Sequence, residues 1–237
     1  METKVIHYCW FGHGPLPRLA KKCIASWKKY LPDYEIKEWN ESNFDVNMIP
    51  YTAEAYQAKK YAFVSDYARF WILYHYGGLY FDTDVEVIKP LDKILADGGY
   101  LGRESIKILG VNPGLGMYIP KGNAFLKEML DEYSQLHFIN SDGSLNLRTI
   151  VEYSDHVLIK HDVKVVNKVQ EYEGILIYPR EYFSPFNKSD LTENTHSIHH
   201  CAASWKGKDI QLKYRISRLL PLPLWNIYVK YFKRKRK

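Results

Sequence analysis

One stretch decides how the middle of this chain folds: Gly77-Gly78-Leu79-Tyr80-Phe81-Asp82-Thr83-Asp84-Val85. Its glycines end an apolar segment with helical spacing, and its apolar residues begin a strand that we expect over residues 79–88. Side chains alternate along a strand, so Asp82 and Asp84 are predicted to point to the same side. Two like charges this close need a counter-charge, and such a carboxylate pair suits Mg²⁺ or Mn²⁺. These ions commonly carry the phosphate groups of a substrate.

Extended and helical patterns alternate on both sides of this stretch. The expected strands are residues 5–11, 35–39, 79–88, 175–178 and 197–201, and the expected helices are residues 19–31, 51–76 and 124–136. Residues 140–172 show little pattern. Strands alternating with helices predict an α/β fold, a mainly parallel sheet flanked by helices in a single domain over residues 1–205.

The cysteines and the N-terminus indicate where the chain works. Cys9, Cys23 and Cys201 are odd in number and form no C-x-x-C pair, which argues against a zinc knuckle or a disulfide framework and favours a reducing compartment. The N-terminus leads straight into an apolar strand rather than a signal peptide, and no apolar run approaches the ~20 residues that span a bilayer. We therefore expect a cytoplasmic protein.

The C-terminal tail, residues 206–237, differs in charge from the rest of the chain. It holds eleven basic residues and one acidic residue, a net charge of +10, whereas the preceding residues carry −4. Aliphatic and aromatic residues from 219 to 232 precede an unbroken basic run. This pattern predicts that residues 219–237 bind an anionic membrane surface. A nucleic-acid-binding tail is the competing interpretation, but the body carries no nucleic-acid-binding motif, so we expect no nucleic-acid partner.

Three further groups of residues are candidates for the site. Asp66 and Arg69 lie three residues apart on a helix among apolar neighbours, so we expect a buried pair that could hold sugar hydroxyls. His199 and His200 would point to opposite faces of a strand, so at most one easily joins a metal site. Trp10 would lie at the carboxyl edge of the sheet, where ligands of open α/β sheets bind.

Five motifs in order carry a family resemblance. They are I-H-Y-C-W-F-G (6–12), S-W-K-K-Y-L-P-D-Y-E-I-K-E-W-N (26–40), S-D-Y-A-R (65–69), Y-G-G-L-Y-F-D-T-D-V (76–85) and I-H-H-C-A-A-S-W (198–205). Together they resemble the DXD-containing glycosyltransferases of family thirty-two, the capsular-polysaccharide and mannosyl/galactosyl transferase group. The chain is also similar to the catalytic domain of the large clostridial glucosylating toxins. The resemblance covers about residues 4–205.

The resemblance implies a GT-A fold, which is Rossmann-like, and a retaining hexosyltransferase. It implies a divalent metal, usually Mn²⁺, and a nucleotide-sugar donor, with a UDP-hexose expected by analogy. The acceptor would be a saccharide or lipid-linked saccharide in bacterial surface polysaccharide synthesis, such as capsule, O-antigen or exopolysaccharide. With the basic tail, this places the protein peripherally on the inner face of the cell membrane.

The resemblance also assigns donor-binding roles. Trp10 would stack on the donor base, with Tyr8 in the same donor-binding set. Asp66 and Arg69 would hold the hydroxyls of the donor sugar. Tyr80 would contact the ribose and sugar side. Ser204 and Trp205 would close over the diphosphate, although Ala203 stands before them where the family usually has glycine, which adds a Cβ to a tight loop.

The metal-binding roles follow in the same way. Asp84 would ligate the metal directly, and Asp82 would reach it partly through water. His199 falls where related metal-dependent transferases place a C-terminal ligand, and His200 is the alternative. Asn112 would lie beside the reacting sugar. The implied catalytic set is Asp66, Arg69, Asp82, Asp84, Asn112 and Trp205.

Two other functions compete with sugar transfer. Residues 79–85 mimic the D-x-D-x-V signature of haloacid-dehalogenase-type phosphotransferases, but that family places it on the first core strand and needs a downstream lysine and acidic pair. A non-enzymatic sugar-binding or membrane-recruitment module would bind without metal dependence and without donor hydrolysis.

For sugar transfer, we find no carboxylate to name as nucleophile and therefore favour same-face attack over double displacement.

Overall fold

A parallel pair of strands begins the fold. The computed structural model describes residues 4–185 and 190–202. β1 (Val5–Cys9) and β2 (Glu35–Trp39) pair in register along their full length. Helix α1 (Arg18–Tyr30) connects them, because parallel neighbours need a crossover.

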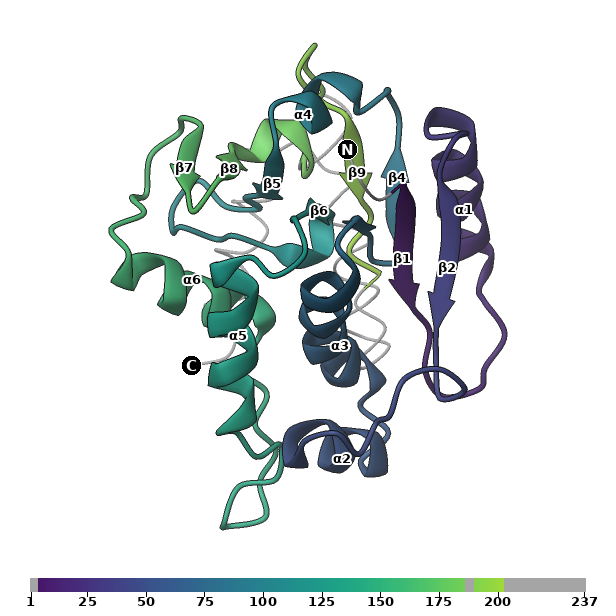
Figure 1. The fold of residues 1–237 in the computed structure, drawn as a ribbon, viewed down its shortest axis with the longest axis vertical. Coiled ribbons are helices and arrows are strands. Elements are labelled where there is room, and N and C mark those ends of the chain that lie inside the picture. The colour runs from purple at the N-terminus through teal and green to yellow at the C-terminus, as the bar shows by residue number, and fades with distance from the viewer. Residues whose placement is uncertain (1–3, 186–189, 203–237) are drawn as a thin grey trace, which may run out of the picture.

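Seven strands form the central sheet in the order β2-β1-β3-β6-β5-β8-β7, and Figure 1 shows helices on both sides of it. Five of them run in one direction, and β6 and β7 run against it. The remaining strands of the sheet are β3 (Leu79–Tyr80), β5 (Gly99–Gly102), β6 (Met117–Tyr118), β7 (Gln170–Tyr172) and β8 (Ile175–Tyr178). The predicted α/β fold with a mainly parallel sheet is confirmed.

The predicted strand over residues 79–88 is wrong, because the chain leaves the sheet at the two aspartates. β3 ends at Tyr80, and the Val85 amide donates to the Asp82 carbonyl (3.0 Å) to close a turn. β4 (Val85–Val87) then pairs antiparallel with β9 (Ser197–His199) in a separate two-stranded sheet. The Trp27 indole of α1 donates to the Val85 carbonyl (2.7 Å), which holds β4 beside α1. The carboxylates therefore lie in a turn between two sheets.

The predicted helix over residues 51–76 is two helices. α2 (Pro50–Gln57) ends where Lys59 adopts a φ of +56°, and the Lys60 amide donates to the Ala55 carbonyl (2.8 Å) as in a Schellman-type cap. α3 (Tyr61–Tyr76) then ends at Gly77, whose φ of +66° suits a residue without a Cβ. The predicted stop at the glycine pair is confirmed.

A helix that sequence patterning missed lies inside residues 140–172. α6 (Ile150–Lys160) begins with a capping box: Thr149 accepts from the Glu152 amide, and the Glu152 carboxylate accepts from the Thr149 amide. The preceding helix, α5 (Ala124–Ser134), is close to its predicted range. The short helices are α4 (Asp92–Ala96), η1 (Pro113–Leu115) and η2 (Arg180–Tyr182).

Neighbouring residues of the central strands pack into two different hydrophobic clusters, one on each face of the sheet. Leu79 and Tyr100 belong to the cluster around Trp27 of α1, whereas Tyr80 and Leu101 belong to the cluster that contains the buried faces of α3, α5 and α6. This alternation is what a sheet covered on both faces requires. Among the described residues, no helix combines the length and apolar character needed to cross a membrane.

Candidate active site

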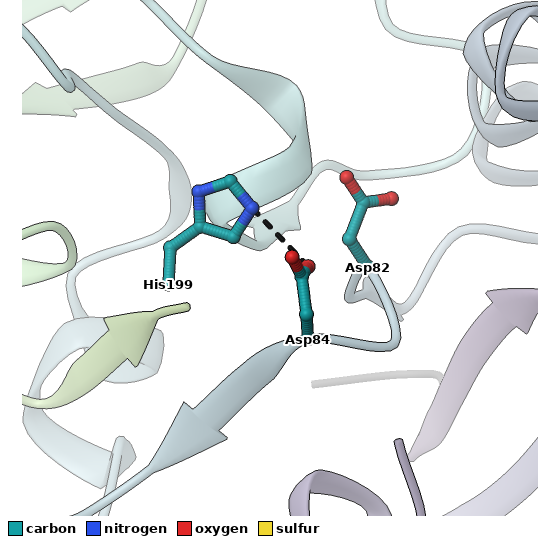
Figure 2. A group of neighbouring side chains, drawn as sticks. All are labelled: Asp82, Asp84 and His199. Carbon is teal, nitrogen blue, oxygen red and sulfur yellow. Dashed lines mark ion pairs between the residues drawn. The ribbon is translucent and has the colours of Figure 1, made fainter. Parts of the chain in front are cut away.

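Two carboxylates and an imidazole meet where the two sheets adjoin. Asp82 and Asp84 come from the turn between β3 and β4, and His199 is the last residue of β9, opposite Val85. One ligand atom from each of the three lies within 4.8 Å of the others. Figure 2 shows the His199 ring facing Asp84, with its Nε2 atom 3.2 Å from Oδ1. We call these three residues the acidic cluster.

Asp84 is held in place by the end of β9. Its Oδ2 accepts from the Ala202 amide (2.7 Å), and its backbone carbonyl accepts from the His200 amide (2.9 Å). Burial by itself would raise the pKa of Asp84, but the charge and hydrogen bond of His199 and the Ala202 amide together hold it below its usual value. Asp84 is therefore a carboxylate at neutral pH.

His199 carries the opposite charge in this pair. Burial would lower its pKa, but the neighbouring Cys201 and the Asp84 carboxylate raise it well above the usual value. A divalent cation bound between the two side chains would displace this proton, so cation affinity is expected to increase with pH.

Arg69 joins Asp82 to a second buried carboxylate. Its Nη1 donates to Asp82 Oδ2 (3.3 Å), and its Nη2 forms ion pairs with Asp82 Oδ1 (3.2 Å) and Asp66 Oδ1 (2.8 Å). The Tyr80 hydroxyl donates to Asp82 Oδ1 (3.1 Å). Because the Arg69 side chain is only 3% exposed, the predicted burial of this pair is confirmed.

The charge of Arg69 only partly compensates the burial of its two carboxylates. Burial raises the pKa of Asp66 to about 7 although Arg69 acts in the opposite direction. Burial likewise raises the pKa of Asp82, against the lowering effect of Arg69. Loss of this guanidinium would raise the pKa of both carboxyl groups further.

A glycine that sequence analysis did not single out touches this carboxylate network. A Cβ at Gly114 would lie 2.2 Å from Oδ2 of Asp82 and 3.1 Å from Nη1 of Arg69. The Asn112 side chain accepts from the Gly114 amide (2.7 Å) and donates to Glu104 Oε2 (2.6 Å). Asn112 thus fixes the backbone that borders Asp82. The Asn-Pro-Gly run of residues 112–114 is the sequence signal that could have indicated a tight turn at Gly114.

Of the two candidate histidines, the structure brings His199 rather than His200 to the carboxylates. His200 is not a member of the acidic cluster, because its Nε2 turns to Glu86 Oε2 (2.8 Å). The two side chains diverge because successive residues of a strand face opposite ways. His199 Nδ1 lies 3.4 Å from Cys201 Sγ, a contact that orients the ring with Nε2 toward Asp84.

The remaining predicted residues lie along β1 or outside the described residues. Tyr8 is buried on β1, where its hydroxyl donates to Glu38 (2.5 Å). Trp10 follows β1 at the carboxyl edge, as expected, and its indole donates to the Gly14 carbonyl (2.6 Å). The predicted roles of Ser204, Trp205 and Ala203, the domain boundary at 205 and the tail over residues 219–237 fall outside the described residues.

The acidic cluster fits a divalent cation. Two carboxylates and one imidazole offer the oxygen and nitrogen ligands that Mn²⁺ accepts, and the carboxylates alone suit Mg²⁺. Three protein ligands leave coordination positions for the oxygens of a diphosphate. The cluster therefore has the chemistry predicted from the D-x-D pattern, with an imidazole added from a segment more than a hundred residues later in the chain.

The comparisons with known families and proteins find glycosyltransferases. Residues 17–100 match the family model described as "Glycosyltransferase sugar-binding region containing DXD motif". Similar proteins include inositol phosphoceramide mannosyltransferase 3 of Schizosaccharomyces pombe, 28% identical over 57% of this chain, and mannosyl phosphorylinositol ceramide synthase SUR1 of Saccharomyces cerevisiae, 32% identical over 46%. The alignments span only 38% and 29% of those two proteins.

Solved structures share the architecture. The PaToxG glycosyltransferase superposes with a TM-score of 0.50, 19% identity and coverage of 67% of this chain and 69% of that one. The chain has the fold of the GT-A glycosyltransferases. A glycosyltransferase involved in glycosylation of the major capsid of PBCV-1 also has a TM-score of 0.50, at 11% identity, over 89% of this chain and 98% of that one. This GT-A fold places the acidic cluster beside the carboxyl end of β3.

Proposed function

We propose that this chain is a metal-dependent hexosyltransferase that uses a nucleotide-diphosphate sugar. The observation that carries the proposal is the acidic cluster, whose three ligand atoms lie within 4.8 Å of one another on a GT-A fold. Both of its aspartates fall inside the segment matched by the DXD family model. A divalent cation held there would act as a Lewis acid that neutralises the charge of the leaving diphosphate.

Arg69 positions the cation-binding carboxylate in this proposal. Its Nη1 donates to one oxygen of Asp82 and its Nη2 forms an ion pair with the other, which also accepts from the Tyr80 hydroxyl. A carboxylate held this way does not need to reorganise when a cation and diphosphate arrive. Asp66 keeps Arg69 in place and lies where we propose that the hydroxyls of the donor sugar bind.

The contacts of the carboxylates support retention through same-face attack. Asp82 and Asp66 are engaged by Arg69, and Asp84 is engaged by His199 and the Ala202 amide. A double displacement needs a carboxylate free to attack the anomeric carbon. Because these three carboxylates are already committed to other partners, we propose that the acceptor attacks from the face that the diphosphate leaves.

The proposed donor is a UDP-hexose, and the proposed acceptor is a saccharide or lipid-linked saccharide of a bacterial surface polysaccharide at the inner membrane face. The names of the yeast relatives favour a second acceptor, inositol phosphoceramide, with mannose as the sugar. Assays should therefore include GDP-mannose beside the UDP-sugars, and inositol phosphoceramide beside saccharide acceptors.

Donor hydrolysis tests the proposed function directly. We expect selective release of one nucleotide from a panel of UDP- and GDP-sugars with Mn²⁺, lost in EDTA and abolished in Asp84→Ala. Asp131→Ala is the matched control, because within the described residues the only ion pair of this exposed aspartate is with Lys127 on the surface of α5. Turnover of Asp84→Ala at the rate of the unaltered chain would overturn the assignment.

The same assay distinguishes the competing functions. No hydrolysis and no metal-dependent nucleotide binding would favour a binding module. Hydrolysis of a generic phosphoester without sugar release would favour a phosphotransferase.

A further inference from the structure

Two loops that are distant in sequence lie side by side at one edge of the molecule. One connects β5 to η1 and the other connects α6 to β7, both on the left in Figure 1. The buried guanidinium of Arg103 joins them: it donates to the Ile108 carbonyl (3.0 Å) in the first loop and to the Val166 carbonyl in the second. The two loops therefore form one surface.

This surface exposes aliphatic side chains that the core does not use. Five of them are between 39% and 60% exposed, and together we call them the aliphatic patch: Ile106, Ile108, Val165, Val166 and Val169. Single exposed aliphatic residues are ordinary, but five of them on two loops that Arg103 joins indicate an interaction surface.

Lysines are interspersed with the aliphatic residues along both loops. Lys107, Lys164 and Lys168 are all exposed, and of these only Lys164 forms an ion pair within the described residues, with Asp162 (2.7 Å). The one carboxylate of the first loop, on Glu104, is engaged by the Asn112 amide. The exposed Lys107 and Lys168 therefore add positive charge to this apolar surface.

Both loops are braced, so the patch is presented in a fixed arrangement. The Gln170 side chain closes the second loop by accepting from the Lys164 amide and donating to the Lys164 carbonyl, both at 2.8 Å. Asp155 of α6 accepts from the amides of Gly110 (2.7 Å) and Val111 (2.9 Å), which anchors the end of the first loop. Binding there would cost little ordering of the backbone.

We propose that the aliphatic patch and its lysines dock the protein on an anionic lipid bilayer. Aliphatic side chains enter the boundary between headgroups and acyl chains, and lysines attract anionic headgroups. A protein partner fits less well, because protein interfaces are depleted in lysine and concentrate their binding energy in Trp, Tyr and Arg, which this surface lacks.

The position of the patch connects docking to the site. The first loop runs from the patch directly into Asn112 and Gly114, which border Asp82 of the acidic cluster. A docked molecule would present this end of the site to the membrane, which suits an acceptor carried on a lipid. This part of the inference rests on the proposed function, whereas vesicle binding itself does not.

Vesicle co-sedimentation of the full chain tests the docking surface. The probe is phosphatidylcholine vesicles with and without 30% phosphatidylglycerol, without metal or donor. We expect Lys107→Glu/Lys168→Glu to lower the partition coefficient on anionic vesicles at least about tenfold, because each basic residue near such a surface contributes roughly a fivefold factor. Ile106→Ser/Ile108→Ser should lower it further on the same vesicles, through lost apolar insertion.

Matched variants on other surfaces serve as controls. Lys21→Glu/Lys28→Glu changes two exposed lysines of α1, and Leu147→Ser changes an exposed aliphatic residue of another loop. All variants are also measured in a chain whose basic run, residues 233–237, is replaced by serine, so that binding through the tail does not mask the patch. Equal losses in patch and control variants, or no loss in the patch variants, would overturn the inference.

Donor hydrolysis separates this inference from the proposed function. The patch variants should hydrolyse donor in solution at the unaltered rate, because none of the changed side chains belongs to the acidic cluster or contacts it. If Asp84→Ala retains sugar transfer while the patch variants lose vesicle binding, the proposed function fails and the docking surface stands. The opposite outcome would leave the transferase and remove the docking surface.

Discussion

Replacing Gly114 with alanine is the sharpest test of the site geometry, because it adds a single methyl group beside a proposed cation ligand. The new Cβ would lie 2.2 Å from Asp82 Oδ2, whereas a carbon and an oxygen normally approach to about 3.3 Å. The carboxylate must therefore move by roughly 1 Å, away from its paired contacts with Arg69. Gly114 does not have a positive φ, so its backbone accepts alanine and the effect is confined to the collision.

This displacement sets the expected size of the effect. A catalytic group misplaced by ~1 Å costs on the order of 10²-fold in rate, equivalent to about 2.7 kcal/mol of transition-state stabilisation. We therefore expect Gly114→Ala to lower Mn²⁺-dependent donor hydrolysis by about 100-fold. Because overpacking one methyl group costs about 1–3 kcal/mol, the variant should still fold, which urea unfolding will show.

Gly14→Ala is the matched control for this experiment. The same substitution at Gly14 would place its Cβ with no heavy atom within 4 Å, so both hydrolysis and stability should remain near those of the unaltered chain. Donor hydrolysis is measured over a Mn²⁺ titration, so that weaker cation binding and slower turnover are distinguished. If Gly114→Ala bound Mn²⁺ and hydrolysed donor like the unaltered chain, the placement of Asp82 as a cation ligand would be refuted.

Two further predictions concern buried charge. Burial lowers the pKa of His7 from 6.5 to about 4. Between these two pH values the imidazole is protonated in the unfolded chain but stays neutral in the folded chain. The free energy of unfolding should therefore fall by about 3 kcal/mol between pH 6.5 and pH 4, and His7→Gln should remove that part of the pH dependence. Separately, Arg69→Met should destabilise the fold by about 3–5 kcal/mol, because it leaves two buried carboxylates without a counter-charge. Adding Asp66→Asn should recover part of this loss.

Urea unfolding across pH provides the readout for both. Glutamine is a fair replacement for His7, because it can accept from the Trp39 indole (3.0 Å) and donate to the Gly77 carbonyl (3.1 Å) as the neutral imidazole does. An unchanged pH slope in His7→Gln would assign the titration to another group. For the second prediction, free energies of Arg69→Met and Asp66→Asn that simply add would show that the two side chains do not interact.

Particular residues show how far the sequence predicted the fold and why it went wrong at two elements. Helical and extended patterning located β1, β2, α1, α5 and β8, because each buries one face or stripe of side chains. The same patterning predicted a single strand over residues 79–88 and a single helix over residues 51–76, where the structure has two strands and two helices. Local patterning does not show that the Trp27 indole bonds to the Val85 carbonyl, which holds β4 beside α1 and away from β3. It also does not show that Lys59 adopts a left-handed conformation, which ends α2. Patterning did not predict α6, although the Thr149-x-x-Glu152 sequence is recognisable as a capping box.

For the site, the sequence by itself determined which chemical groups the chain brings: a D-x-D pair after a glycine stop, a charged pair on an apolar helix and two late histidines. These follow from residue type and spacing, which fix the local conformation and the cost of burying charge. Only the tertiary structure decided that His199 rather than His200 faces Asp84, since this depends on the register of β9 against β4. Likewise, Gly114 borders Asp82 only because the chain returns there after β5. Contacts between distant segments are set by how the sheets and helices pack, and local sequence does not encode them.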